Sequence, residues 1–220
     1  MKRLLPVVVC VATLFAAELS AANLGGRVNF VTKRGQRPVV AETLVWLEPA
    51  AKSAPRKAAT FNMTTRGKTL VPHVLAIPVG STVQFPNDDP ISHNLFSLSS
   101  ANSFDLGLYR RGTGKSFTFK TPGVVNVYCN VHPTMSSVIH VMSTPYFAFT
   151  DANGAFALTD VAPGTYTLVA WNEQGGMVQS KVDLSAAGAN NLAVTIDSTA
   201  YRAAQHLNKE KKPYAPPRDY

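Results

Sequence analysis

Cysteine, histidine and methionine are scarce in this 220-residue chain, which contains two, five and five of them respectively. Cys10 lies in an apolar N-terminal segment, so Cys129 is the only cysteine in the rest of the chain. A single cysteine cannot close a disulfide within the chain. In an oxidising compartment, such a cysteine forms an intermolecular bridge, acts as a reactive thiol or binds a metal.

The chain also lacks a hydrophobic run long enough to span a membrane comfortably. Its N-terminus has the basic residues Lys2 and Arg3, an apolar run from Leu4 to Ala17, and small residues up to Ala22. This order is typical of a secretory signal peptide. We therefore expect cleavage near Ala22 and a periplasmic or secreted mature protein without a membrane span.

Clusters of basic and aromatic residues that would bind nucleic acid are missing as well. The formal net charge is +8, and it becomes +7 when the signal peptide is removed with Lys2, Arg3 and Glu18. A basic surface attracts acidic proteins or anionic membranes. Because the chain has the features of an exported protein and no basic–aromatic cluster, we expect no nucleic-acid partner.

Short segments rich in β-branched, aliphatic and aromatic residues alternate with turn-forming residues after the N-terminal segment. This spacing is typical of Greek-key sandwiches and barrels, and it predicts an all-β fold. The clearest expected strands are Ala41 to Leu47, Thr82 to Phe85, Val124 to Cys129, Val138 to Val141 and Thr165 to Trp171.

The segment from Tyr128 to Met135 is the most informative part of the chain. It places Cys129, His132 and Met135 three residues apart, and His93 lies 36 residues before the cysteine. One thiolate and two imidazoles in a plane, with a weak axial thioether, form the ligand set of a blue-copper electron-transfer site. Zinc sites do not use methionine. The predicted ligands of one copper ion are therefore His93, Cys129, His132 and Met135.

Each of these residues alone is more often a core or turn residue, and only their joint occurrence favours copper. The other histidines are not assigned to metal. We expect a structural or surface position for His73, a side chain pointing away from the core for His140, and a place in the tail for His206. Asp88 and Asp89 precede a proline and are expected to form a turn.

Residues 60–142 resemble the cupredoxin family, closest to its plastocyanin, pseudoazurin and amicyanin branch. The matching motifs include Val79-Gly80-Ser81-Thr82-Val83, Phe85-Pro86-Asn87-Asp88-Asp89, His93-Asn94, Phe104-Asp105-Leu106-Gly107, and Tyr128-Cys129 followed by His132 and Met135. The resemblance implies a Greek-key β-sandwich or barrel with a type 1 copper ion. It also implies that the Asn94 side chain ties the two ligand loops together and that His132 is the exposed ligand.

The flanks resemble a carboxypeptidase-regulatory-like or transthyretin-like β-sandwich, which would be the second and smaller sandwich. The motifs are Gly26 to Val28 and Thr43 to Leu47 on one flank, and Asp151 to Leu158 and Val161 to Leu168 on the other. Two arrangements are open. The copper module is inserted into a loop of one flanking sandwich, or the flanks are a separate arm and a C-terminal domain.

The expected organisation has five segments. They are a signal peptide at 1–22, an N-terminal β segment and linker at 23–57, a cupredoxin domain at 58–142, a second β-sandwich at 143–197, and a basic, poorly ordered tail at 198–220.

These features predict an exported electron carrier and not an enzyme, since the ligand set leaves no open position for a substrate. Its redox partner would be a dehydrogenase, a c-type cytochrome or an oxidase component, and acidic partners suit the basic surface. One alternative is a copper storage or delivery protein, although such proteins more often carry exposed Met- or His-rich clusters. Another is a cell-envelope binding module with incidental copper. A multicopper oxidase is disfavoured because no further His-rich clusters exist.

Overall fold

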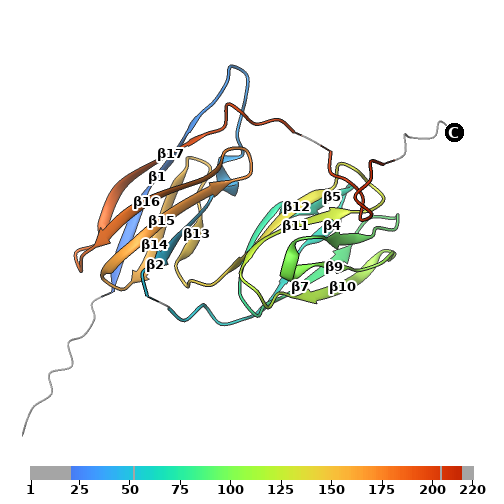
Figure 1. Ribbon diagram of the computed structural model, residues 1–220, viewed down its shortest axis with the longest axis horizontal. Coiled ribbons are helices and arrows are strands. Elements are labelled where there is room, and N and C mark those ends of the chain that lie inside the picture. Colours follow the sequence, from blue (N-terminus) through green and yellow to red (C-terminus); the bar gives the residue numbers. More distant parts are fainter. Residues whose placement is uncertain (1–20, 52, 204, 215–220) are drawn as a thin grey trace, which may run out of the picture.

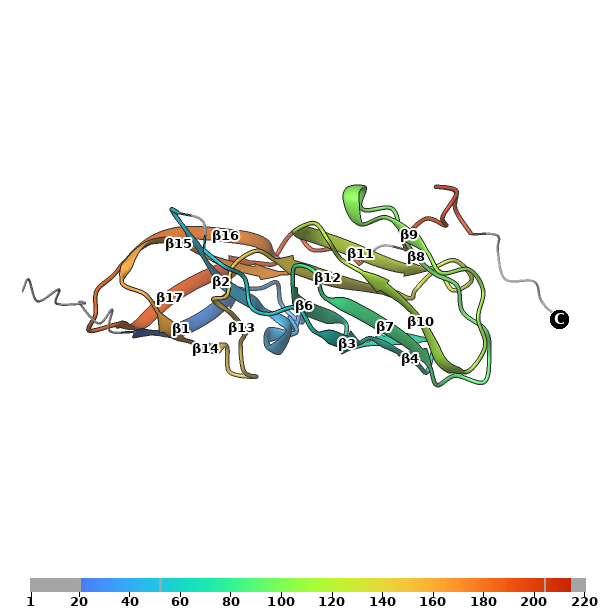
Figure 2. The same ribbon diagram turned by 90° about the horizontal axis from the view of Figure 1, so that it is seen from below.

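The computed structural model describes residues 21–51, 53–203 and 205–214, and this part of the chain forms two β lobes (Figures 1 and 2). Two short 3₁₀ helices, η1 (Val40–Glu42) and η2 (Ser100–Asn102), accompany the strands. No helix in these ranges is long and apolar enough to cross a membrane. The predicted signal peptide falls mostly on residues 1–20, outside the described residues, and Ala22 already belongs to the first strand.

One lobe, which we call the flanking sandwich, combines strands from both ends of the chain. Its two sheets have the orders β14-β1-β17 and β13-β2-β15-β16. Residues from both sheets, such as Leu24 and Leu168, share one hydrophobic core. The strands are β1 (Ala22–Val31), β2 (Leu44–Pro49), β13 (Phe147–Phe149), β14 (Ala155–Val161), β15 (Gly164–Asn172), β16 (Gly176–Leu184) and β17 (Ala189–Asp197).

Strand pairing decides between the two arrangements that the sequence leaves open. In β2, Trp46 pairs with Val169 of β15, and in β1, Val28 pairs with Val194 of β17. Strands that precede and follow the central part of the chain therefore share sheets. The central lobe is inserted into a single flanking sandwich, and the N-terminal flank is not a separate arm.

The other lobe, the central sandwich, contains strands β3 to β12. Its sheets have the orders β10-β7-β4-β5, with β3 beside β7, and β6-β12-β11-β8-β9. The strands are β3 (Thr60–Asn62), β4 (Thr64–Arg66), β5 (Thr69–Val71), β6 (Val74–Pro78), β7 (Thr82–Asn87), β8 (Leu95–Ser97), β9 (Phe104–Asp105), β10 (Gly112–Thr118), β11 (Gly123–Cys129) and β12 (Ser136–Met142).

The alternation of residues in β11 places the cysteine inside the central sandwich. Val125, Val127 and Cys129 are buried, whereas Val124 and Asn126 are exposed. Because side chains alternate between the two faces of a strand, residues two apart point to the same side. Cys129 therefore enters the core at the last position of the strand.

The two sandwiches meet across β12, which is buried on both faces. Ile139 packs in the core of the central sandwich, whereas Met142 packs against residues of the flanking sandwich. His140 points away from the core of its own sandwich, as expected, but it is not on the surface. Its ring centroid lies 6.0 Å from that of Trp46 and 4.3 Å from that of Trp171.

Part of the tail, for which we expect poor order, makes defined contacts in the structure. Residues 199–203 and 205–214 lead from the flanking sandwich to the far side of the central sandwich (Figure 1). The Lys209 N–H donates to Asn130 Oδ1 over 3.0 Å, and the Tyr214 hydroxyl donates to a main-chain carbonyl. These contacts are long-range in sequence, so no local periodicity indicates them. Residues 215–220 lie outside the described residues.

Because His140 is buried at the interface between the two sandwiches, we expect the protein to become less stable at acid pH. Burial lowers the pKa of His140 to about 4 from an ordinary value of 6.5. The unfolded chain therefore binds the proton more tightly than the folded protein does. As the pH drops from 6.5 to about 4, the free energy of unfolding falls by about 3 kcal/mol. We expect His140→Phe to remove this part of the pH dependence. Denaturant unfolding followed by tryptophan fluorescence measures it, since both tryptophans flank His140. The same change of the free energy of unfolding with pH in the wild-type and His140→Phe proteins would contradict the prediction.

Candidate metal centre

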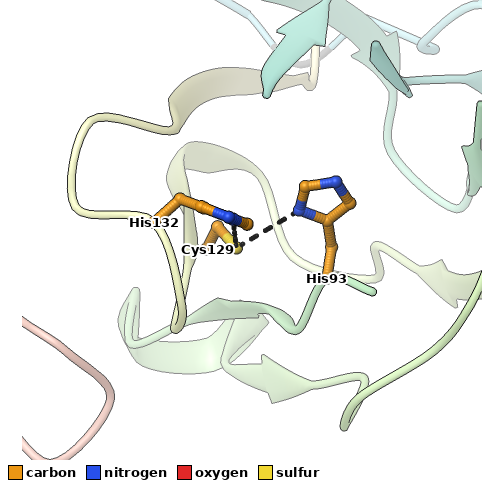
Figure 3. Close-up of side chains that lie close together, drawn as sticks. All are labelled: His93, Cys129 and His132. Atoms are coloured by element: carbon orange, nitrogen blue, oxygen red, sulfur yellow. Dashed lines mark hydrogen bonds between the residues drawn. The ribbon is translucent and has the colours of Figure 1, made fainter. Parts of the chain in front are cut away.

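Three of the four predicted ligands converge at one end of the central sandwich (Figure 3). His93 lies before β8, Cys129 ends β11, and His132 lies in the loop that follows. Because Cys129 pairs with Leu95 across the two strands, the segment with His93 lies beside the cysteine. One ligand atom from each of the three residues lies within 4.8 Å of the others.

The closest approaches join the cysteine sulfur to the two proximal ring nitrogens. Cys129 Sγ lies 3.7 Å from His93 Nδ1 and 3.5 Å from His132 Nδ1 (Figure 3). A sulfur and a nitrogen that share one ion at about 2.0–2.3 Å, in a trigonal plane, lie roughly 3.7 Å apart. The donor set and its spacing are therefore compatible with a copper ion bound by one thiolate and two imidazoles.

Met135 closes the loop that carries the cysteine and His132. Its N–H donates to His132 O over 3.1 Å, and its carbonyl accepts the Cys129 N–H over 3.1 Å. The Met135 side chain is 1% exposed and packs in the same core cluster as the cysteine. We call residues 129–135 the ligand loop.

The two histidines differ in exposure. His93 and Cys129 are fully buried, whereas His132 is half-buried. Burial lowers the pKa of His132, and the neighbouring His93 and Lys68 lower it further. A neutral imidazole keeps the lone pair that a metal ligand needs. His132 is the side chain through which this site reaches the surface.

Asp89 holds the orientation of His93, and sequence reasoning missed this role. Its Oδ2 atom lies 2.9 Å from His93 Nε2, and its two oxygens also accept the N–H groups of Gly67 and Lys68 over 2.6 and 3.0 Å. Burial alone would raise the pKa of Asp89, but these amides and His93 outweigh it and keep the pKa below its ordinary value. A carboxylate on the distal nitrogen fixes which nitrogen faces the metal position. The one signal for this role in the sequence is that Asp89 lies four residues before His93.

Asn94 connects the two ligand-bearing segments through its main chain. The Asn130 N–H donates to Asn94 O over 2.8 Å, whereas the Asn94 side chain donates to Asp105 Oδ1 over 2.6 Å. The expected link is present, but the side chain does not make it. Instead, the side chain anchors the neighbouring β9 strand, and this network fixes the backbone beside His93.

Among the described residues, none of the remaining histidines belongs to this cluster. His73 Nε2 pairs with Glu173 Oε2 across the two sandwiches at 2.5 Å. The ring of His206 stacks on that of Tyr128 with centroids 4.4 Å apart. Together with His140, these residues join parts of the fold that are distant in sequence.

We expect Asp89→Ala to lower the free energy of unfolding of the metal-free protein by about 2–4 kcal/mol. The variant leaves the buried Nε2 atom of His93 without its acceptor, and it removes the acceptor of the amides of the exposed residues Gly67 and Lys68. Asp88→Ala is the matched control, because Asp88 forms an exposed ion pair with Arg66 that should contribute about 0–1 kcal/mol. Chemical denaturation of both variants measures the difference, and equal losses would refute it.

Comparison with known proteins gives partial likenesses. Residues 130–192 match the family model described as polysaccharide lyase family 4, domain II, which is neither of the families that the motifs resemble. No curated protein matches the chain.

Solved structures that match part of the chain include copper proteins. The reduced Cu(I) form of an amicyanin mutant at pH 4 is 18% identical and covers 44% of this chain and 98% of its own, with a TM-score of 0.36. A pseudoazurin from Sinorhizobium meliltoi is 20% identical, and the match covers 39% of this chain and 76% of the pseudoazurin chain, with a TM-score of 0.34. The Cu-containing nitrite reductase from Thermus scotoductus SA-01 is 25% identical, and the match covers 52% of this chain and 28% of the reductase chain, with a TM-score of 0.36. Each of these matches covers only part of this chain.

Proposed function

We propose that this protein carries single electrons through one type 1 copper ion. His93, Cys129 and His132 would bind the ion in a plane, and Met135 would be the weak axial ligand. The observation that carries this proposal is the position of the buried Cys129 sulfur, 3.5 and 3.7 Å from two imidazole nitrogens. Copper bound by these donors supplies a one-electron couple between its +1 and +2 states.

The protein's part is to keep the donors in one geometry for both oxidation states. Cys129 is fixed at the end of a paired strand, and its N–H is bonded to Met135 O. His93 is buried and held by Asp89. Because these groups have little freedom to rearrange, electron exchange requires little movement of the ligands, which makes transfer fast.

Burial also supports an electron carrier over an enzyme or a delivery protein. His93 and Cys129 are inaccessible to solvent, which disfavours direct contact of these two residues with a substrate or with a competing metal ligand. Electrons would leave through the partly exposed ring of His132, which is next to the exposed Val131. The partner would be an exported dehydrogenase, a c-type cytochrome or an oxidase component. Slow copper loss to a chelator is expected for a carrier, and rapid loss would favour delivery.

Copper reconstitution tests the ligand set. We expect the Cu(II) protein to have an intense thiolate-to-copper absorption band and a narrow copper hyperfine splitting in its electron paramagnetic resonance spectrum. Cys129→Ser should abolish both, because the hydroxyl cannot form the covalent metal–thiolate bond. The control is His73→Gln, which removes a histidine that pairs with Glu173 outside the cluster and should leave both signals intact. The same loss in both variants would rule out the proposed set.

The axial position makes a separate prediction. Met135→Gln should keep bound copper and the absorption band, because the three planar donors remain, but it should change the midpoint potential. Voltammetry of the wild-type and variant proteins measures this change. An unaltered potential would remove Met135 from the ligand set.

A further inference from the structure

A segment near the C-terminal end of the described residues lies against the candidate metal centre. We call residues 205–214 the strap, which follows the flanking sandwich in sequence but lies on the central sandwich (Figure 1). The Tyr214 hydroxyl donates to Cys129 O over 2.6 Å, and the Lys209 N–H donates to Asn130 Oδ1 over 3.0 Å. The strap therefore contacts the first two residues of the ligand loop.

The strap also reaches the segment that carries His93. The Lys209 ammonium group lies 2.8 Å from Asp105 Oδ2. The other oxygen of Asp105 accepts the Asn94 side chain over 2.6 Å, and Asn94 follows His93 directly. Lys209 thus connects both arms of the site, one through its main chain and the other through its side chain.

The strap has its own internal order. Asn208 closes a turn in which its N–H donates to Lys212 O over 2.9 Å and its side-chain oxygen accepts two further amides. His206 is held between two aromatic rings, stacked on Tyr128 at 4.4 Å and edge-on to Tyr214 at 5.3 Å. These contacts join protein groups only. The strap can therefore fix the ligand loop in the metal-free protein.

We propose that the strap is a positioning element of the metal centre, in which Tyr214 fixes the main chain of Cys129 and Lys209 fixes Asn130. The inference rests on the proposed copper function. Both main-chain polar groups of Cys129 then have partners within the site, since its N–H donates to Met135 O. The position of the sulfur relative to the two imidazoles follows from this fixed backbone.

The hydroxyl of Tyr214 has an electrostatic effect as well. The hydroxyl donates its hydrogen to the main-chain oxygen of Cys129. Its O–H dipole presents the positive end to the cysteine. A positive potential at this position favours the reduced state of the site, which carries one more electron.

The test compares Tyr214→Phe with Tyr166→Phe. Tyr166 is the matched control because its hydroxyl also donates to a main-chain carbonyl, that of Ala162 in the flanking sandwich, over 2.7 Å. In the metal-free protein, Tyr214→Phe should speed amide hydrogen exchange at Cys129, Asn130 and Met135 by roughly two- to tenfold, as expected for one lost hydrogen bond. In the copper-loaded protein, it should lower the midpoint potential. The control should change neither.

The two readouts separate this inference from the copper function. Failure to bind copper would overturn the proposed function, while the hydrogen exchange of the metal-free protein would still decide whether the strap fixes the loop. Wild-type exchange in Tyr214→Phe would overturn the strap's role and leave the copper site intact. Faster exchange with an unchanged potential would reduce the strap to a structural support and also overturn the proposal.

Discussion

The fixed position of the buried Cys129 sulfur is the constraint on which the other features of this molecule depend. Alternation in β11 turns the side chain inward, and pairing with β8 brings His93 alongside it. The short ligand loop then returns His132 to the same point. The three residues come from the segment before β8, from the end of β11 and from the loop that follows it, so their relative positions depend on the backbone hydrogen bonds of these segments.

The flanking sandwich supports this arrangement from two directions. It covers the outer face of β12, whose other face forms part of the central core, and His140 is held between Trp46 and Trp171 at this interface. The same lobe is also the origin of the strap, which reaches the ligand loop from the opposite end. An insertion between two strands of one sandwich ties the central lobe at both of its ends, and the strap adds a third connection.

The sequence predicts the local features of this protein well and its long-range contacts poorly. Alternation and turn residues indicate strands such as β7 and β11, and the joint occurrence of His93, Cys129, His132 and Met135 at their spacing indicates the candidate site. The role of Asp89 was hidden because aspartate before proline is explained by a turn. The contacts of the strap could not be foreseen from the sequence. Lys209 bonds to Asn130, which lies 79 positions earlier, and Tyr214 bonds to Cys129, which lies 85 positions earlier. Contacts of this kind leave no periodic pattern.

X-ray absorption at the copper edge of the reconstituted protein would show whether the Cys129 sulfur binds the metal. We expect one copper ion per chain with a single short sulfur bond and two nitrogen neighbours in both oxidation states, and little change between them. Coordination by nitrogen and oxygen alone, or a set of neighbours that rearranges on reduction, would contradict it.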